Sequence, residues 1–280
     1  MKGLFCGKNE RLYQSDTVFF SFENHQQEIR KKTLSNFLLF CYNQCMKTKN
    51  KRTRRVIWIL IFFLLAGLGW WLSQGGLWNH EAILKKVPAY NGQPWVELEG
   101  NHPRFTLREI KKKSFEKYAR LDSLGRCGPA IACIGQDLMP MEPRGSIGSI
   151  QPSGWQQAKY PGIIPEDPPY LYNRCHLIAY QLSGENANEL NLITGTRYFN
   201  VSGMQTWENQ VASYVRRTGN HVMYRVTPVF QGREKVCRGV TIEAWSVEDQ
   251  GAGICFYVFV YNVQPGIEIE YRTGESHISS

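Results

Sequence analysis

Three adjacent residues in the second half of the chain carry side chains that could do chemistry. Arg174, Cys175 and His176 lie between two apolar runs in the stretch YLYNRCHLIAYQL, residues 170–182. A neutral imidazole, with an ordinary pKa near about 6.5, can act as a general base near pH 7. Cys175 and His176 are the residue types of a thiol nucleophile and its base, but adjacent residues of a strand point to opposite faces. We therefore expect His176 to work without the thiol.

A second set of candidate residues lies about 30 positions downstream, on the clearest helical pattern beyond residue 72. At about 100° per residue, the stretch from Met204 to about Arg217 has one apolar face. Gln205, Asn209 and Arg216 fall on a separate polar stripe, and Glu208 lies beside the apolar face. The pattern predicts a helix that offers an amide and a guanidinium to solvent.

The elements that must position these residues follow from composition and turn signals. We expect a strand from Leu171 toward Leu182, a short second strand at 190–195, the loop TRYFNVSG and then the helix. The last 60 residues read as strands separated by turns, which predicts an antiparallel meander and an α+β fold. Upstream, residues 106–122 have helix-forming composition, with three lysines on a solvated face. Residues 123–170 are rich in Gly and Pro and read as structured loop.

The order of a strand with histidine, a second strand and a helix with asparagine is that of a ββα-metal finger. The chain resembles the DNA/RNA non-specific endonuclease family, most closely its branch of DNA-entry and secreted streptococcal nucleases. The family's Asp-Arg-Gly-His motif is matched by Asn173-Arg174-Cys175-His176, and its asparagine-bearing helix by FNVSGMQTWENQ. The similarity also includes MPMEPRGSIGSIQPSGW, YRVTPVF, IEAWS and VYNVQPGIEIEYRTGE, so it covers roughly residues 90–275.

The resemblance implies an α+β fold, a ββα-metal nuclease core with an antiparallel sheet, and a metal site. In this reading His176 is the general base that activates water, and Asn209 is the direct ligand of one Mg²⁺, for which Mn²⁺ can substitute. Asn200 is the alternative ligand, or a partner that positions Asn209 or the water molecules of the metal. Glu208 could hold another of those water molecules.

The same resemblance implies which residues meet the substrate. Arg174, with Arg216 or Arg197, would bind phosphate, since a guanidinium matches two phosphate oxygens at once. The expected substrate is DNA, with RNA as an alternative, cleaved internally with weak sequence preference because phosphate contacts carry no base information. The oligomeric state is left open.

Two positions depart from the family motif. Asn173 stands where the motif has aspartate, and Cys175 stands where it has glycine. We expect Cys175 to be a small packing residue. These departures keep two alternatives open, a catalytically weak or inactive DNA-binding module derived from a nuclease, and a toxin-like nuclease effector.

The positive charge of the chain is concentrated before an apolar segment. Of the 33 Lys and Arg residues, 12 lie in residues 1–55, with 4 of the 24 acidic residues, and the remainder of the chain is nearly neutral. Residues 56–72, VIWILIFFLLAGLGWWL, are uncharged and long enough at about 1.5 Å per residue to cross most of a bilayer core. The basic cluster directly before them predicts a cytoplasmic N-terminus.

This pattern predicts a single-pass membrane protein with an extracellular nuclease domain. The expected parts are a basic cytoplasmic tail at 1–55, a transmembrane signal anchor at 56–72, an extracellular linker at 73–105 and the nuclease domain at 106–280. Within the tail, residues 1–45 are either disordered or an over-extended start. Cleavage of the anchor near Gly75 is the alternative, and would make the protein secreted.

The eight cysteines divide into three before the apolar segment and five after it. In an oxidising compartment the five could form up to two disulfides and leave one thiol. Cys127 and Cys133 are close enough in sequence to close a small loop. Cys237 and Cys255 fail a register test, because a simple meander places Cys255 opposite about Trp245 and Cys237 opposite about Pro228.

Overall fold

The computed structural model describes Arg52, Val56, Trp58, Ile59, residues 61–63 and residues 80–279. The chain divides into two compact units, of which the first contains the described residues from His80 onward. In the other unit the few described residues are helical. Most of the span predicted at 56–72 lies outside the described residues. Within the described part of the chain, no helix is both long and apolar enough to cross a membrane.

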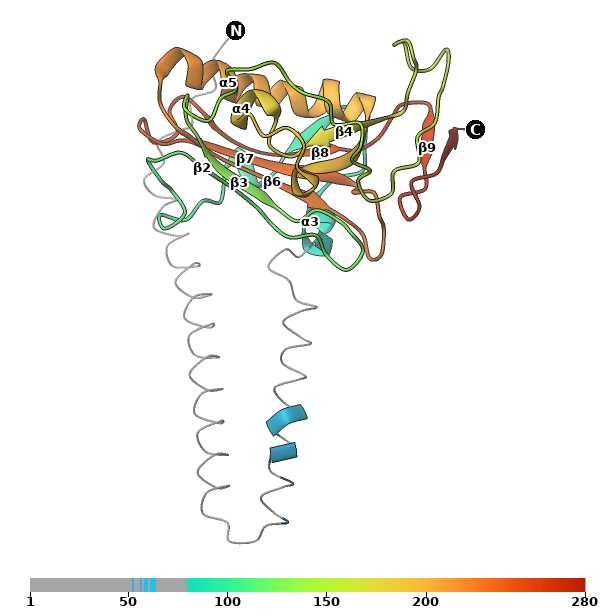
Figure 1. The fold of residues 1–280 in the computed structure, drawn as a ribbon, viewed down its shortest axis with the longest axis horizontal. Helices are drawn as coiled ribbons and strands as arrows, with labels where there is room; N and C mark the ends of the chain where they lie inside the picture. The colour runs from blue at the N-terminus through green and yellow to red at the C-terminus, as the bar shows by residue number, and fades with distance from the viewer. Residues whose placement is uncertain (1–51, 53–55, 57, 60, 64–79, 280) are drawn as a thin grey trace. The chain divides into compact units, whose positions relative to one another are not determined.

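A six-stranded antiparallel sheet forms the centre of the first unit, in the order β1-β8-β7-β6-β3-β2 (Figure 1). Its strands are β1 (Trp95–Glu97), β2 (Phe115–Tyr118), β3 (Ala130–Ile134), β6 (Val222–Val229), β7 (Gly239–Ser246) and β8 (Cys255–Tyr261). The predicted meander of the last 60 residues is confirmed, and the register places Cys255 opposite Trp245. Two hairpins stand apart from this sheet, β4 (Tyr172–His176) with β5 (Leu192–Thr196), and β9 (Ile267–Ile269) with β10 (Ser276–Ile278).

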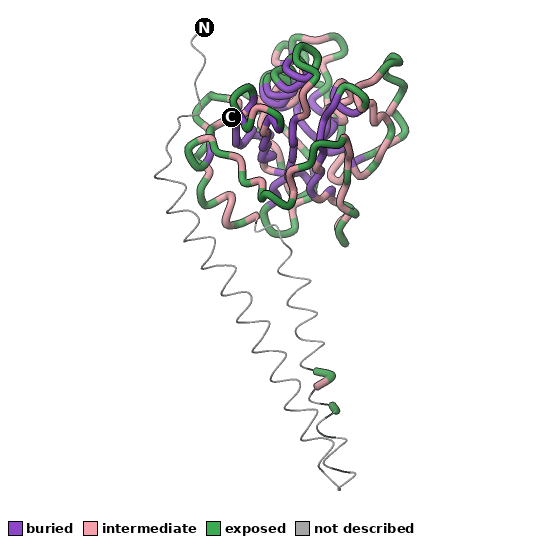
Figure 2. Tube along the Cα trace, turned by 90° about the vertical axis from the view of Figure 1, so that its left-hand side faces the viewer, coloured by how far each residue is buried: buried purple, intermediate pink, exposed green. Residues whose placement is uncertain are grey.

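Both faces of the sheet are covered, which explains why every residue of β6 is buried. On one face lies α5 (Gln205–Thr218), preceded by the π-helical turn η3 (Phe199–Met204). Its Trp207 packs between Trp95 and Phe256, with ring centroids 4.9 and 4.6 Å apart. The helix predicted from Met204 to about Arg217 is thus confirmed. Figure 2 shows the buried residues gathered in the sheet and the inner side of this helix.

The opposite face of the sheet is covered by the segment that precedes residue 106. The helix α3 (His80–Lys86) packs Ile83 and Leu84 against a hydrophobic cluster that includes Val229 of β6, and the backbone N–H of Phe230 donates to His80 Nδ1 at 3.1 Å. This segment, expected to be a linker up to residue 105, is therefore packed into the domain. The reason is that its apolar residues cover strands whose outer face would otherwise be exposed.

An ion-pair network fastens the end of the same segment to the sheet. Glu243, fully buried on β7, accepts from the backbone N–H of Arg104 at 2.7 Å and from Nε and Nη2 of Arg225 at 3.1 Å each. Arg225 also donates to Glu109 at 2.7 Å. Partial burial would raise the pKa of Glu109, but the hydrogen bonds from the N–H and hydroxyl of Thr106, followed by the pairing with Arg225, lower it overall. Glu243 is thus a structural residue of the sheet.

Two secondary-structure expectations are wrong. Residues 106–122 do not form a helix, since Phe115–Tyr118 is the edge strand β2, paired with β3. The pairing with a preformed sheet overrides helix propensity, which is a weak preference. The stretch 123–170 is loop for most of its length, but it contains β3, whose residues Ala130, Ala132 and Ile134 face the core. The strand expected from Leu171 ends at His176, and a short helix α4 (Tyr180–Ser183) follows.

Four cysteines, Cys127, Cys133, Cys175 and Cys237, are free thiols buried in the domain. Cys127 and Cys133 belong to different hydrophobic clusters, and burial raises the pKa of each to about 12. Cys175 is 1% exposed and faces Gly195, where a Cβ atom would come within 2.6 Å of its Sγ. This confirms Cys175 as a small packing residue, and its buried thiol, with a raised pKa, is unsuited to nucleophilic chemistry.

Candidate active site

The β4–β5 hairpin presents His176 at its end. The register pairs His176 with Leu192 and Tyr172 with Thr196. The hairpin is attached to the large sheet through Asn262, fully buried after β8, whose Oδ1 accepts from the backbone N–H of Thr196 at 3.0 Å and whose Nδ2 donates to the carbonyl of Thr194 at 3.1 Å. His176 is therefore held by a rigid support on the helix-covered side of the domain.

The His176 ring has a defined hydrogen-bonding arrangement. Its Nε2 lies 2.8 Å from the carbonyl oxygen of Asn186, and a carbonyl can only accept, so Nε2–H is the donor. In the neutral ring Nδ1 then carries the lone pair. Burial lowers the pKa of His176 below 6.5, the Asn186 carbonyl opposes this shift, and the nearby positive charge of Arg144 adds to it. The ring is thus a neutral base at pH 7.

The backbone that follows His176 is fixed by a fully buried asparagine. Asn191 Oδ1 accepts from the backbone N–H of Ile178 at 2.9 Å, and its Nδ2 donates to the carbonyl of the same residue at 3.0 Å. The carbonyl of Asn191 also accepts from the N–H of Leu177 at 2.8 Å. These bonds set the direction in which the chain leaves the strand and enters α4.

The helix α4 connects the histidine to the asparagine of α5. Gln181, five residues after His176, donates from Nε2 to Asn209 Oδ1 at 2.9 Å. Asn209 is exposed on the first half of α5. The structure therefore places α4, which begins four residues after His176, against α5 at Asn209.

Glu208 and Cys175, the neighbours of these two residues, are both buried inside the domain. Glu208 is 8% exposed, and its burial raises its pKa to about 8. Its charge in turn contributes to the raised pKa of Cys175. The end of β4 and the beginning of α5 thus lie close together. Glu208 thus lies on the inner side of the helix, as buried as His176, and its role in holding a metal-bound water stays a prediction.

The donors available at this site suit a hard, well-hydrated cation. Within the described residues, no group of three or more His, Cys, Asp or Glu side chains is arranged to hold a metal. Asn209 offers an amide oxygen that keeps a second lone pair beside the bond from Gln181. A single exposed oxygen ligand leaves room for water, which fits Mg²⁺, an ion that retains several waters in proteins.

The remaining predicted residues are more dispersed. Arg197 donates to Glu166 at 2.9 Å, and its backbone N–H bonds to Leu171, so it lies about five residues, roughly 16 Å of strand, from His176. Asn200 lies nine residues before Asn209, in the π-helical turn η3 that leads into α5, and it stays the alternative candidate.

Arg216 is exposed in the last turn of α5, two turns beyond Asn209 on the same face of the helix. Arg174, on β4, directs its guanidinium into the loop before the hairpin. Its Nη2 donates to the carbonyl of Gly148 at 2.8 Å, its Nε donates to the carbonyl of Ile150, and its plane lies over the ring of Trp155 at 4.2 Å.

Four residues near the site were missed from the sequence: Arg144, Gln181, Asn186 and Asn191. Arg144 lies in the Gly- and Pro-rich stretch read only as loop, and its proximity to His176 depends on tertiary folding. Asn186 acts through its backbone carbonyl, which has no residue-type signal. The position of Gln181, one turn of helix after the histidine strand, is the one clue that spacing could have supplied.

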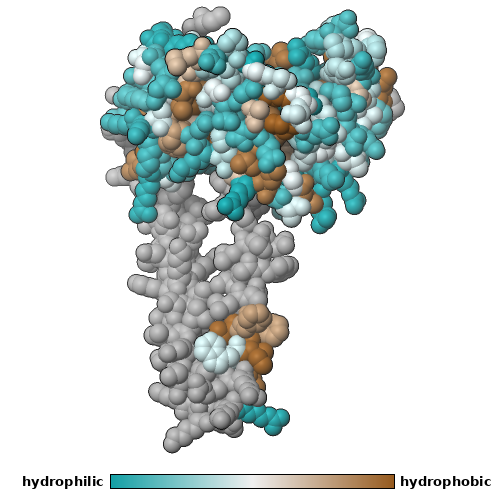
Figure 3. Space-filling view, in the orientation of Figure 1, coloured by the Kyte–Doolittle hydropathy of each residue, from teal (hydrophilic) through white to brown (hydrophobic). Residues whose placement is uncertain are grey.

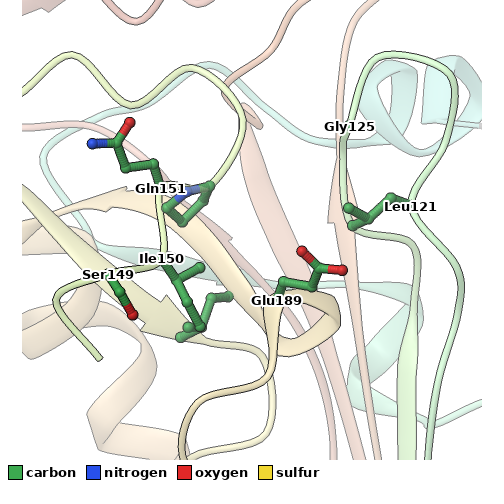
Figure 4. A pocket seen from close by; sticks show the side chains of 8 residues that line it. Leu121, Gly125, Ser149, Ile150, Gln151 and Glu189 are labelled. Atoms are coloured by element: carbon green, nitrogen blue, oxygen red, sulfur yellow. The ribbon is translucent and has the colours of Figure 1, made fainter. Parts of the chain in front are cut away.

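A surface pocket beside the β4–β5 hairpin is not suited to bind phosphate. It has a volume of about 220 Å³ and is lined by the loops at 121–125 and 149–152 with Glu189 and Leu192. Figure 4 shows the Glu189 side chain between Ile150 and Leu121. Its lining contains a carboxylate and no basic side chain, so it repels an anion. Figure 3 shows a largely hydrophilic face of the domain with small apolar patches.

Comparisons with known proteins identify the family of the chain. The family profile for DNA/RNA non-specific endonucleases matches residues 107–248. A deoxyribonuclease of Streptococcus dysgalactiae subsp. equisimilis is 34% identical over 110 residues, which is 38% of this chain and 32% of that protein. The match thus spans about a third of the relative's length.

Solved structures of similar fold include NucA from Streptococcus agalactiae with magnesium bound, with a TM-score of 0.60 and 23% identity over 70% of this chain and 92% of that one. The Sda1 nuclease with bound zinc gives a TM-score of 0.57 and 26% identity over 67% of this chain and 97% of that one. The α+β architecture with its antiparallel sheet and ββα arrangement is thus confirmed. With a profile match to half of its length, the chain belongs to the DNA/RNA non-specific endonuclease family.

Proposed function

We propose that this protein is a metal-dependent endonuclease that hydrolyses phosphodiester bonds of DNA, with RNA as the alternative substrate. The observations that carry the proposal are a neutral, oriented His176 and an exposed Asn209, which accepts a hydrogen bond from Gln181, five residues after the histidine. A base and an exposed oxygen ligand on one side of a rigid support are the minimum that hydrolysis of a phosphodiester needs.

His176 supplies the base. Its Nδ1 takes a proton from the attacking water, while Nε2–H stays bonded to the Asn186 carbonyl at 2.8 Å, which orients the ring and stabilises the imidazolium that forms. Arg144, exposed and close enough to influence the His176 pKa, is placed to bind the phosphate under attack. Its charge also favours the neutral form of the base.

Asn209 would hold the metal ion through its free amide lone pair. A bound Mg²⁺ would neutralise charge on the phosphate and on the leaving 3′-oxygen. The choice of Mg²⁺, with Mn²⁺ as a substitute, rests on the oxygen donor, and magnesium in the NucA structure supports it. The zinc of the Sda1 structure makes a second divalent ion worth testing.

Digestion of a plasmid by the full chain in a non-ionic detergent tests the proposal. The wild type should cleave with Mg²⁺ and stop with EDTA, and His176→Ala should lose activity by a factor of at least about 100. His277→Ala is the matched control, because the exposed His277 pairs with Glu268 within the terminal hairpin at 2.9 Å and belongs to neither β4 nor α5. Equal cleavage by wild type and His176→Ala would contradict the assignment. Binding without cleavage by the wild type would favour a DNA-binding module.

We also propose that the apolar segment at 56–72 anchors the protein in the cell membrane, with the basic tail in the cytoplasm and the nuclease domain outside. The support is the length of the segment and the basic cluster before it. External protease should then remove the nuclease domain from intact cells while the tail stays protected. Recovery of the protein from culture supernatant would instead indicate cleavage of the anchor and secretion.

A further inference from the structure

Arg174 uses its guanidinium on protein groups of one loop segment. Nη2 donates to the carbonyl of Gly148 at 2.8 Å, Nε donates to the carbonyl of Ile150, and the plane stacks on Trp155 with 4.2 Å to the ring centroid. Two carbonyl acceptors and an aromatic face match the planar fork of an arginine. A lysine could provide the charge but not this combination.

The residue across the hairpin holds the same segment. Thr194 pairs with Arg174 in the register, and its Oγ1 donates to the carbonyl of Ser153 at 2.9 Å. Farther along the loop, the side chain of Gln157 makes two hydrogen bonds to the backbone of Tyr172. Its Nε2 donates to the carbonyl at 2.7 Å, and its Oε1 accepts from the N–H at 2.9 Å. Residues 148–157 are thus bonded to successive positions of the catalytic hairpin.

The preceding residues of the loop, 142–147, lie next to the active site. The hydroxyl of Tyr180, on α4, donates to the carbonyl of Glu142 at 2.8 Å. A Cβ atom at Gly145 would come within 2.9 Å of Asn186 Nδ2, and Asn186 is the residue that holds the His176 ring. Arg144 therefore lies on a short exposed span between the attachment at residue 142 and the attachment that Arg174 makes at residue 148.

We propose that Arg174 is a positioning residue that fixes the loop at residues 148–150 and so places Arg144 beside His176, and that it does not itself bind the substrate phosphate. This inference rests on the proposed nuclease function. Arg174 and His176 are two residues apart on one strand, so both side chains leave the same face, and the loop lies along that face. The arginine of the motif thus acts through the loop.

The two roles for Arg174 predict different results when Arg174 and Arg144 are changed together. If Arg174 positions the loop, Arg174→Lys should lower kcat/KM on the order of 100-fold, since a displacement of about 1 Å at a reacting centre can cost that much. Lysine would also weaken a two-point contact to phosphate, so the double variant is the one that separates the two roles. In the positioning role, adding Arg144→Ala to Arg174→Lys should have little further effect, whereas independent phosphate contacts would give multiplied losses.

Two further readouts separate positioning from a general loss of structure. Removing the Arg144 charge from the ring should raise the His176 pKa, so Arg144→Ala and Arg174→Lys should both move the acidic limb of kcat/KM to higher pH. Hydrogen exchange of the amides at 145–151 should speed up in Arg174→Lys and in Thr194→Val, with the sheet amides unchanged. This measurement does not require activity, so it tests the loop contact even if the nuclease proposal fails.

Arg126 provides a matched control. It also donates to two backbone carbonyls, Gly232 at 2.9 Å and Glu234 at 3.0 Å, and lies over the ring of Phe230 at 4.6 Å. Arg126→Lys should leave kcat/KM within about twofold of wild type while loosening its own loop. Near-wild-type activity of Arg174→Lys, multiplicative losses in the double variant, or unchanged exchange at 145–151 would each overturn the proposal.

Discussion

Replacing Asn191 by alanine tests whether one buried side chain sets the path of the chain behind the catalytic histidine. The change removes the two bonds, of 2.9 and 3.0 Å, that Asn191 makes to the backbone N–H and carbonyl of Ile178. Ile178 is itself fully buried, so water cannot replace the lost partners without a change in structure. Each buried polar group left unsatisfied costs about 1–3 kcal/mol.

The expected loss is therefore about 2–6 kcal/mol of the free energy of unfolding, a large share of the roughly 5–15 kcal/mol typical of a domain. Urea unfolding of residues 80–280, followed by tryptophan fluorescence, measures it. Asn91→Ala is the control, because the exposed Asn91 accepts one bond, from the N–H of Gln93 at 3.2 Å. That control should stay within about 0.5 kcal/mol of wild type.

Activity supplies a second measurement on the same variant. Asn191 fixes residues 177 and 178, directly after His176, so the folded fraction of Asn191→Ala should also show a lower kcat. A destabilisation below about 1 kcal/mol would refute the reasoning, since it would mean that the polar groups of Ile178 find other partners at little cost.

Three other predictions concern the base, the ion-pair network and the domain boundary. Because burial lowers the pKa of His176, the imidazole stays neutral as pH falls to 6.5, and kcat/KM should reach half its plateau only below pH 6.5; a midpoint above 6.5 would contradict this. Glu243→Gln should lower the free energy of unfolding by about 3–5 kcal/mol, because Arg225 loses its buried negatively charged partner. The kcat/KM measured at low temperature should stay near wild type. Urea unfolding and activity assays on the same variant measure the two effects. A chain that begins at residue 107, where the family profile begins, should fail to fold, whereas a chain that begins at His80 should fold. The reason is that only the longer chain retains α3 and Trp95, and circular dichroism measures the difference.

The core of the site could be predicted because its signals are local. Composition and turn signals identified the His176 strand, and a 3.6-residue period identified the Asn209 helix, so the order of the ββα elements followed from the sequence. Burial of Glu208 could not be foreseen with the same certainty, since it lies at the margin of the apolar face, where a small rotation of the helix decides between core and solvent.

The errors arose where tertiary pairing outweighs local preference. Residues 115–118 have helix-forming neighbours but pair with β3, and β3 itself is a five-residue apolar strand inside a stretch rich in Gly and Pro. The role of Arg174 was equally hidden, because its partners are backbone carbonyls 24 and 26 residues away, which no residue pattern identifies.

The position of β2 at one edge of the sheet has a consequence for how the protein behaves when concentrated. Its outer side has no neighbouring strand in the described sheet, and such an edge can pair with the edge of another molecule. Lys112 and Lys113 directly before the strand, and Lys117 within it, are exposed. Their positive charges repel the same edge of another molecule. These lysines, which the sequence pattern assigned to a solvated helix face, therefore disfavour aggregation through β2.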